Sequence, residues 1–194
     1  MTEARATLRV PEAFFDGGCI ADAFHGTLER SAQGIAEKGF RSSAEAGQHY
    51  GPGVYFFESD YFAACWFANH RRREVASNDR LAVVQATVNL GRTFYANAIT
   101  VEVEKARREL GKQLGTEVPP MVVFRLVGNK LREQKLIDSV KVVRHRTKPK
   151  PEPDSYRTEI VLLVFESKKI ESRVKVRHPR EFGRSRTVQV TLEF

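Results

Sequence analysis

Cysteine is scarce in this chain: its 194 residues include only two, Cys19 and Cys65. Two cysteines cannot form the disulfide framework that stabilises many small secreted domains. The sequence also lacks any Cys/His cluster with the spacing of metal ligands. We therefore expect a protein of a reducing compartment, the cytoplasm, without a metal site.

Long apolar runs are lacking as well. A membrane-spanning helix requires about 20 consecutive apolar residues, and no segment of the chain provides them. Glu3, Glu12 and Asp16 interrupt the start of the chain, so we expect no signal peptide. Hydrophobic residues nevertheless make up 41% of the sequence and charged residues 29%, which is typical of a folded domain. We expect one domain over residues 1–194 and no association with a membrane.

Positive charge is present in excess and is unevenly distributed. The whole chain carries 32 − 24 = +8, and residues 139–194 alone carry 14 − 7 = +7. Such an asymmetry indicates a surface that meets an anion, either nucleic acid, an acidic protein or a phosphate group. A basic surface without any partner is the alternative.

The chain contains no internal repeat, and its apolar patterns alternate between helix and strand periods. Helices are expected over residues 31–38, 61–68, 101–114 and 121–136, although the start of the last could equally form a strand. Strands are expected over residues 54–57, 81–90, 139–143, 160–165 and 187–194. A further strand is expected to end at Ala23-Phe24, just before His25. Loops are expected over 42–53 and 145–155. Because regular βαβ units are missing, this order favours an α+β fold over a doubly wound sheet.

Two of these helices have recognisable ends. Thr27 or Ser31 can cap the first helix, which should end at Gly39. The second should start at Ser59 or Asp60. Residues 61–68 are apolar almost all round, which predicts a largely buried helix.

The most informative stretch lies between residues 25 and 57. It contains His25-Gly26-Thr27, then Gly39-Phe40-Arg41, then Gly51-Pro52-Gly53-Val54-Tyr55. A hydrophobic core requires neither a His-Gly pair nor a Gly-x-Gly before an aromatic residue. A nucleotide pocket has use for both, since glycines let a ligand approach the backbone and a tyrosine ring can stack on a base.

These motifs, followed much later by Tyr156-Arg157-Thr158-Glu159, resemble the ADP-ribosyltransferase superfamily. Within it, they are most similar to the His-Tyr-Glu branch, which includes poly(ADP-ribose) polymerase catalytic domains and diphtheria-like toxins. The resemblance covers about residues 20–175, followed by a basic C-terminal strand region over 176–194. It implies a split antiparallel β-sheet with flanking helices and with NAD bound, as a substrate, in a cleft between the two halves.

The resemblance also implies roles for individual residues. His25 would bond a hydroxyl of the adenine-side ribose, and the Gly26 backbone would pair with the nicotinamide carboxamide. Tyr55 would stack on the nicotinamide ring, and Trp66 would form the opposite wall. Two further residues complete the implied NAD-binding set: Thr27 and Arg41, the latter near the adenosine or a phosphate.

Glu159 would be the catalytic carboxylate beside His25 and Tyr55. Cleavage of the nicotinamide–ribose bond builds positive charge on the sugar, which a fixed carboxylate stabilises. It can also orient or deprotonate the incoming nucleophile.

Two positions depart from the family pattern. Ala63 replaces a serine that in many members contacts the nicotinamide amide. Arg157 stands where toxins that modify arginine or asparagine carry Glu or Gln, so those acceptors are not expected. The basic stretch before Glu159 favours a phosphate-bearing acceptor, RNA or DNA, and the expected acceptor-binding residues are Arg144, Arg146, Lys148, Lys150 and Arg157.

The sequence therefore predicts a mono-ADP-ribosyltransferase similar to a bacterial toxin or a phage-defence effector, with an antitoxin or immunity protein as a further possible partner. Three alternatives stay open. One is a protein ADP-ribosyltransferase. Another is an RNA 2′-phosphotransferase, which shares the His-Gly-Thr start but needs histidines and arginines that the Tyr55 motif does not supply. The third is a non-catalytic module that binds NAD or ADP-ribose.

Overall fold

The structure of the protein, a computed structural model, describes residues 15–42, 50–97, 101–147, 156–166 and 169–177. Within these ranges the helices are α1 (Glu29–Lys38), α2 (Tyr61–Glu74), α3 (Val101–Leu114) and α4 (Pro120–Glu133). The strands are β1 (Phe15–Asp16), β2 (Cys19–Leu28), β3 (Val54–Glu58), β4 (Leu81–Asn89), β5 (Arg92–Asn97), β6 (Ser139–Thr147), β7 (Tyr156–Val164) and β8 (Ile170–Arg177). The expected α+β class is confirmed.

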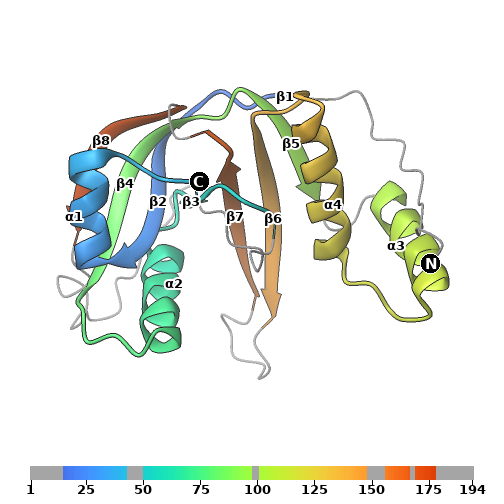
Figure 1. Ribbon diagram of the computed structural model, residues 1–194, viewed down its shortest axis with the longest axis horizontal. Coiled ribbons are helices and arrows are strands. Elements are labelled where there is room, and N and C mark those ends of the chain that lie inside the picture. Colours follow the sequence, from blue (N-terminus) through green and yellow to red (C-terminus); the bar gives the residue numbers. More distant parts are fainter. Residues whose placement is uncertain (1–14, 43–49, 98–100, 148–155, 167–168, 178–194) are drawn as a thin grey trace, which may run out of the picture.

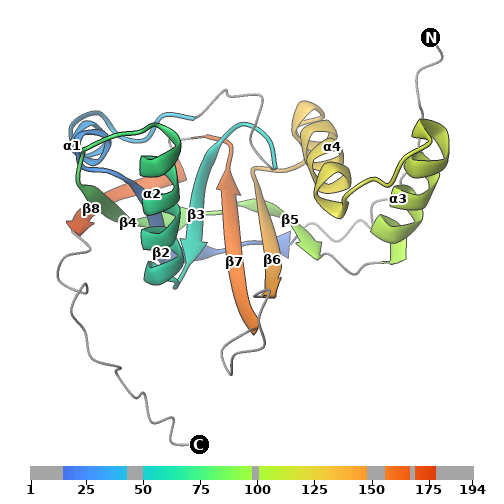
Figure 2. The same ribbon diagram turned by 90° about the horizontal axis from the view of Figure 1, so that it is seen from below.

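All eight strands belong to one sheet with the order β1-β5-β6-β7-β3-β2-β4-β8. Neighbouring strands are antiparallel except for β5 and β6, which are parallel. Figure 1 shows the sheet as a continuous arch, and Figures 1 and 2 both show α1 and α2 at one end and α3 and α4 at the other. The sequence patterns did not predict β1, β5 or β8, and the strand expected over 187–194 lies outside the described residues.

The sheet is weakly joined between β2 and β3. These strands are in register at only two positions, Ala23 with Glu58 and Phe24 with Phe57. On its other side, β2 pairs with β4 at eight positions. The arch therefore consists of two well-paired halves, β8-β4-β2 and β3-β7-β6-β5, that meet along a short seam.

Helices cover both faces of the sheet. Alternate residues of β4 show this: Val84 packs in the same cluster as Ala32 of α1, whereas Val83 packs with Ala64 of α2. The cluster on the α2 face also includes residues of α3 and α4. Because strand side chains alternate between faces, one sheet separates two hydrophobic cores.

Helix α2 begins as expected but is longer and less buried than its sequence suggested. The carboxylate of Asp60 caps it by accepting a hydrogen bond from the Ala63 N–H at 2.9 Å. The prediction of a largely buried helix is wrong for its large rings, because Phe62 is 59% exposed and Trp66 49% exposed. The buried positions of α2 are mostly small: Tyr61, Ala63, Ala64 and Ala68. Alanines allow a close approach to the sheet, which leaves the large rings outside.

The ends of α1 give a mixed result. The helix ends at Gly39 as expected, with φ of 75° and its N–H bonded to the Ile35 carbonyl at 2.8 Å. At its start the capping position is Leu28, without a side-chain cap, and neither Thr27 nor Ser31 fills that role.

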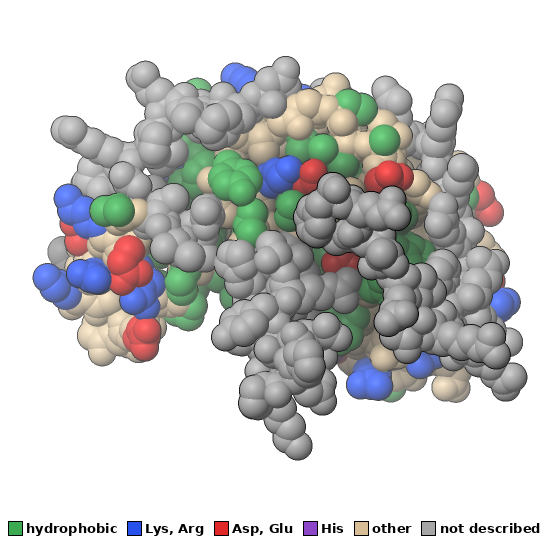
Figure 3. Space-filling view, turned by 180° about the vertical axis from the view of Figure 1, so that it is seen from behind, with side chains coloured by type: hydrophobic (Ala, Val, Ile, Leu, Met, Phe, Trp, Pro, Cys, Tyr) green, Lys and Arg blue, Asp and Glu red, His purple; other side chains and the backbone are tan. Residues whose placement is uncertain are grey.

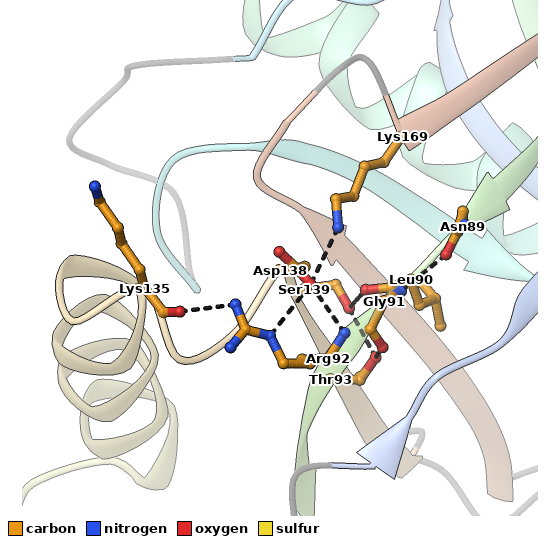
Figure 4. Close-up of polar contacts among 9 residues, drawn as sticks. All are labelled: Asn89, Leu90, Gly91, Arg92, Thr93, Lys135, Asp138, Ser139 and Lys169. Carbon is orange, nitrogen blue, oxygen red and sulfur yellow. Dashed lines mark hydrogen bonds and ion pairs between the residues drawn. The ribbon is translucent and has the colours of Figure 1, made fainter.

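A cluster of polar residues joins the starts of β5, β6 and β8 (Figure 4). The Asp138 carboxylate lies 3.0 Å from both the Arg92 N–H and the Lys169 Nζ, and the Ser139 hydroxyl donates to the Leu90 carbonyl at 2.8 Å. Burial raises the pKa of Asp138, but the bonds from Arg92 and Lys169 outweigh it and hold the pKa below its ordinary value. Because β8 belongs to one half of the sheet and β5 and β6 belong to the other, the cluster connects the two halves in addition to the β2–β3 seam.

Candidate functional site

A cavity of about 840 Å³ opens at the seam between β2 and β3. Cavities that bind small molecules and cofactors fall in this range, about 300 to 1,000 Å³. Two helices form its walls, each with residues at i, i+3, i+4 and i+7, the spacing of one helix face. From α1 these are Ser31, Gly34, Ile35 and Lys38, and from α2 they are Phe67, His70, Arg71 and Glu74.

His25 and Tyr55 meet at the floor of this cavity, and both line it. The Nδ1 of His25 lies 2.8 Å from the carbonyl oxygen of Tyr55. Because a carbonyl only accepts hydrogen bonds, the proton lies on Nδ1, and Nε2 of the neutral ring is left as an acceptor. This bond spans β2 and β3 just beyond their last registered pair, so the histidine bridges the seam.

Aromatic rings hold the His25 imidazole on the α1 side of the sheet. Its centroid lies 5.5 Å from the Phe40 ring and 5.8 Å from the Phe56 ring. Burial among these rings lowers the pKa of His25, against the opposing effect of its bond to the Tyr55 carbonyl. The imidazole is therefore neutral near pH 7, which keeps Nε2 available to accept a bond from a ligand hydroxyl.

The Tyr55 ring is anchored at its hydroxyl. That hydroxyl donates to the Gly51 carbonyl at 2.6 Å and accepts from the Tyr50 N–H at 3.2 Å. Burial raises the pKa of Tyr55 to about 12, so the phenol stays protonated. The ring itself is only partly buried and lines the cavity, which fixes a flat aromatic surface in the site.

The glycines of both motifs are explained by packing. A Cβ on Gly26 would overlap the carbonyl oxygen of Ala64 in α2, and one on Gly53 would lie 2.8 Å from the Val164 carbonyl oxygen. A Cβ on Gly51 would lie 2.6 Å from Oδ1 of Asn129. Close contacts with α4 and β7 therefore give Gly51 and Gly53 a packing role, and Gly53 also lines the cavity, so the ligand approach inferred from sequence stays a prediction.

Of the remaining residues in the expected NAD-binding set, the structure places some at the cavity and one away from it. Gly26, Thr27 and Arg41 all line the cavity together with His25 and Tyr55. Trp66 is not among the lining residues; its ring stacks on His70, with centroids 5.3 Å apart and planes inclined by 10°. The aromatic residue of α2 that lines the cavity is its neighbour, Phe67.

Glu159 lies within β7, paired in register with Arg144 of β6. Val161, two residues further on, lines the cavity and pairs with Phe57. Positions 159 and 161 share one face of the strand, about 7 Å apart. The side chain of Glu159 lies outside the described part of the structure, so its distance from Tyr55 stays a prediction.

The expected acceptor-binding residues fall partly outside the structure. Arg146 and Arg157 pair in register across β6 and β7, next to the pair of Arg144 and Glu159, and their side chains are not described. Lys148 and Lys150 lie outside the described residues altogether. The backbone of the described portion brings three of the five positions beside Glu159.

Sequence reasoning missed the α2 wall of the cavity. Phe67, His70, Arg71 and Glu74 have a helical spacing that the sequence displays, but the expected helix ended at residue 68. His70 Nε2 lies 3.2 Å from Glu74 Oε1, and Arg71 Nη1 lies 3.4 Å from Glu74 Oε2. Together they place an imidazole, a guanidinium and a carboxylate in the cavity wall.

Among the described residues, no group of three or more His, Cys, Asp or Glu side chains is placed to hold a metal ion. No helix in those ranges has the length and apolarity to cross a membrane. Comparison of the sequence with models of known protein families finds no match, and comparison with curated proteins finds none either. The site must therefore be interpreted from its own geometry.

Proposed function

We propose that the protein is an NAD-dependent mono-ADP-ribosyltransferase, and that the cavity at the seam of the sheet is its NAD cleft. The observation that carries the proposal is the bond between His25 Nδ1 and the Tyr55 carbonyl inside a cavity large enough for a dinucleotide. The two residues lie 30 positions apart in the chain, yet they present a hydrogen-bond acceptor and an aromatic face to one space. The short seam supports assignment to the split-sheet fold of this superfamily.

In the proposed complex, His25 Nε2 accepts a bond from a ribose hydroxyl, and the nicotinamide ring stacks on Tyr55. An offset aromatic stack contributes about 1 kcal/mol beyond burial. Lys38 and Arg41 line the α1 side of the cavity, where their charges suit the pyrophosphate. Neither of them has an ion-pair partner within the described ranges, so their charge is available to a ligand.

The proposed chemistry breaks the bond between nicotinamide and C1′ of its ribose. The bonding electrons leave with nicotinamide, which departs as a neutral molecule, and positive charge develops on the ribose ring. Glu159 stabilises that charge as a carboxylate, and preorganised groups of this kind contribute several kcal/mol. An acceptor nucleophile then forms the new bond to C1′, and its proton passes to Glu159 as general base.

The proposed acceptor is nucleic acid. The chain carries a net charge of +8, and three basic positions flank Glu159 on β6 and β7. Phosphate-rich acceptors gain affinity from such charge through counterion release.

The test measures nicotinamide release and label transfer from NAD labelled in its adenylate. Purified protein is incubated with NAD alone, and with NAD together with RNA, 2′-phosphorylated RNA, DNA or a protein extract. We expect release to accompany label transfer to RNA or DNA. Transfer to protein would indicate the protein-modifying alternative, and release only with 2′-phosphorylated RNA would indicate the phosphotransferase.

Two matched variants test whether Glu159 is the catalytic carboxylate. Glu159→Gln should lower the release rate by at least about 100-fold, since it removes a charge that acts in the transition state. Glu133→Gln, on the exposed surface of α4, is the control and should leave the rate unchanged. NAD binding without any nicotinamide release would instead indicate the non-catalytic module.

A further inference from the structure

Helix α2 exposes an unusual combination of side chains on its outer face. Phe62 is 59% exposed and Trp66 is 49% exposed. Arg73, seven residues after Trp66, is exposed as well. Residues four and seven positions apart share one side of a helix, so these three form a ridge. Large aromatic rings are normally buried, and their exposure beside an arginine indicates a binding surface.

His70 connects this ridge to the cavity. Its ring stacks on Trp66 almost in parallel, at 5.3 Å and 10°, and Glu74 bonds its Nε2 at 3.2 Å. The same side chain lines the cavity together with Arg71. The ridge of Phe62, Trp66, His70 and Arg73, here called the α2 ridge, is therefore continuous with the proposed site.

The charge of α2 complements a polyanion. Arg71, Arg72 and Arg73 stand together in its last turn, against Glu74 as the single acidic residue of the helix. Glu74 binds Arg71 at 3.4 Å, whereas Arg72 and Arg73 have no acidic partner among the described residues. In helix α3 both arginines are bound by acids: Arg108 by Glu104 at 3.2 Å, and Arg107 by Glu104 and Glu117, both at 2.8 Å. Acidic and basic side chains accordingly intermix over the α3 end of the molecule, at the left of Figure 3.

We propose that the α2 ridge binds a single strand of nucleic acid and directs one of its nucleotides into the cavity. The proposal rests on the proposed function, for which it names the acceptor and its path. Single strands offer exposed bases that stack on aromatic rings, while arginines neutralise their phosphates. Bases of a duplex are already stacked on each other and cannot reach Phe62 or Trp66. An acidic peptide would satisfy the arginines but has no flat bases to stack on Phe62 or Trp66.

Binding is tested without NAD, so that failure of the α2 ridge proposal can be distinguished from failure of the transferase proposal. Trp66 is the single tryptophan of the chain, and its fluorescence reports on stacking directly. The full chain is titrated with a 12-nucleotide single-stranded RNA, the same sequence as DNA, its duplex, and a polyglutamate peptide. We expect a single strand to quench Trp66 at concentrations at which the duplex and the peptide do not.

Variants locate the contact by anisotropy of a labelled strand. Trp66→Ala should weaken binding by roughly 5- to 150-fold, the loss expected for one stacked base, and Trp66→Phe should recover part of it. The matched control is Leu126→Ala on α4, which is likewise 49% exposed and should change nothing. Arg73→Ala should reduce the slope of log affinity against log salt by about 1, and Lys130→Ala should not.

The proposal is overturned if Trp66→Ala binds as well as Leu126→Ala, or if duplex or polyglutamate quenches Trp66 as strongly as the single strand. Loss of strand binding in an enzyme that still releases nicotinamide would refute the α2 ridge alone. Strand binding in a protein that never releases nicotinamide would support the ridge and refute the transferase.

Discussion

Replacement of Gly26 by alanine should destabilise the protein through one specific contact. Gly26 lies in β2 directly beneath α2, and its missing side chain is what allows that helix to approach the sheet. An added Cβ would overlap the carbonyl oxygen of Ala64 and would lie 2.8 Å from its carbonyl carbon and 3.1 Å from the Ala68 nitrogen. All three are backbone atoms, so no side chain can rotate away, and α2 itself has to move.

The size of the effect follows from this rigidity. Overpacking of a tight core costs about 1 to 3 kcal/mol, and contacts with backbone place this change at the upper end. Alanine also reduces the conformational freedom of the unfolded chain, which offsets this loss of stability by about 0.4 to 1 kcal/mol. The net loss should be about 2 kcal/mol, which lowers the melting temperature of a domain of this size by about 4 to 8 °C.

The assay is thermal and urea unfolding of Gly26→Ala beside Gly34→Ala. Gly34 lies in α1 on the opposite wall of the cavity, and no atom lies within 4 Å of its added Cβ. Alanine is favoured over glycine inside a helix by about 0.8 to 1 kcal/mol, so this variant should melt about 2 to 4 °C higher. The two glycine-to-alanine changes should therefore shift the melting temperature in opposite directions. Equal stability of Gly26→Ala and the parent protein would refute the packing of α2 on β2 described above.

Three further changes test the polar contacts. Tyr55→Phe removes both bonds of the hydroxyl and should cost about 1 to 2 kcal/mol in urea unfolding, yet lower NAD affinity less than Tyr55→Ala, which also removes the ring. Asp138→Asn should cost about 1 to 3 kcal/mol near pH 7. Because the pKa of Asp138 is lowered, the stabilisation that its carboxylate gives the fold is present above the ordinary aspartate pKa and fades as the pH falls below it. The parent protein and Asp138→Asn should therefore converge in stability in acid. A difference that stays constant with pH would contradict the assignment. Because the pKa of His25 is lowered in the folded protein, the unfolded chain binds a proton at this residue more readily than the folded protein does. The free energy of unfolding should therefore fall as the pH drops below 6.5, and His25→Gln should remove that part of the fall.

The sequence was sufficient to select two residues that the structure brings together in the candidate site. His25 and Tyr55 each stand in a short motif, and the structure brings both to one cavity. The start of α2 could also be predicted, because an aspartate before an apolar run acts on the local backbone. Such signals are read from neighbouring residues alone, without knowledge of the rest of the fold.

What could not be predicted depends on contacts between distant segments. The burial of α2 is decided by how closely Ala64 and Ala68 approach β2, and this leaves Trp66 outside although its segment is apolar. Strand β8 gains its place from pairing with β4, a contact between segments far apart in the chain. The glycines of the Tyr55 motif suggested ligand approach, and nothing in the sequence indicated their close contacts with Leu163 on β7 and Asn129 on α4.

The most direct measurement is a crystal structure with a non-hydrolysable NAD analogue. The nicotinamide ring should lie against the ring of Tyr55, with a ribose hydroxyl within hydrogen-bond distance, about 2.7 to 3.2 Å, of His25 Nε2. The Glu159 carboxylate should reach the nicotinamide ribose. An analogue bound in the cavity with its ribose beyond the reach of Glu159, or bound away from Tyr55, would contradict the proposed transferase.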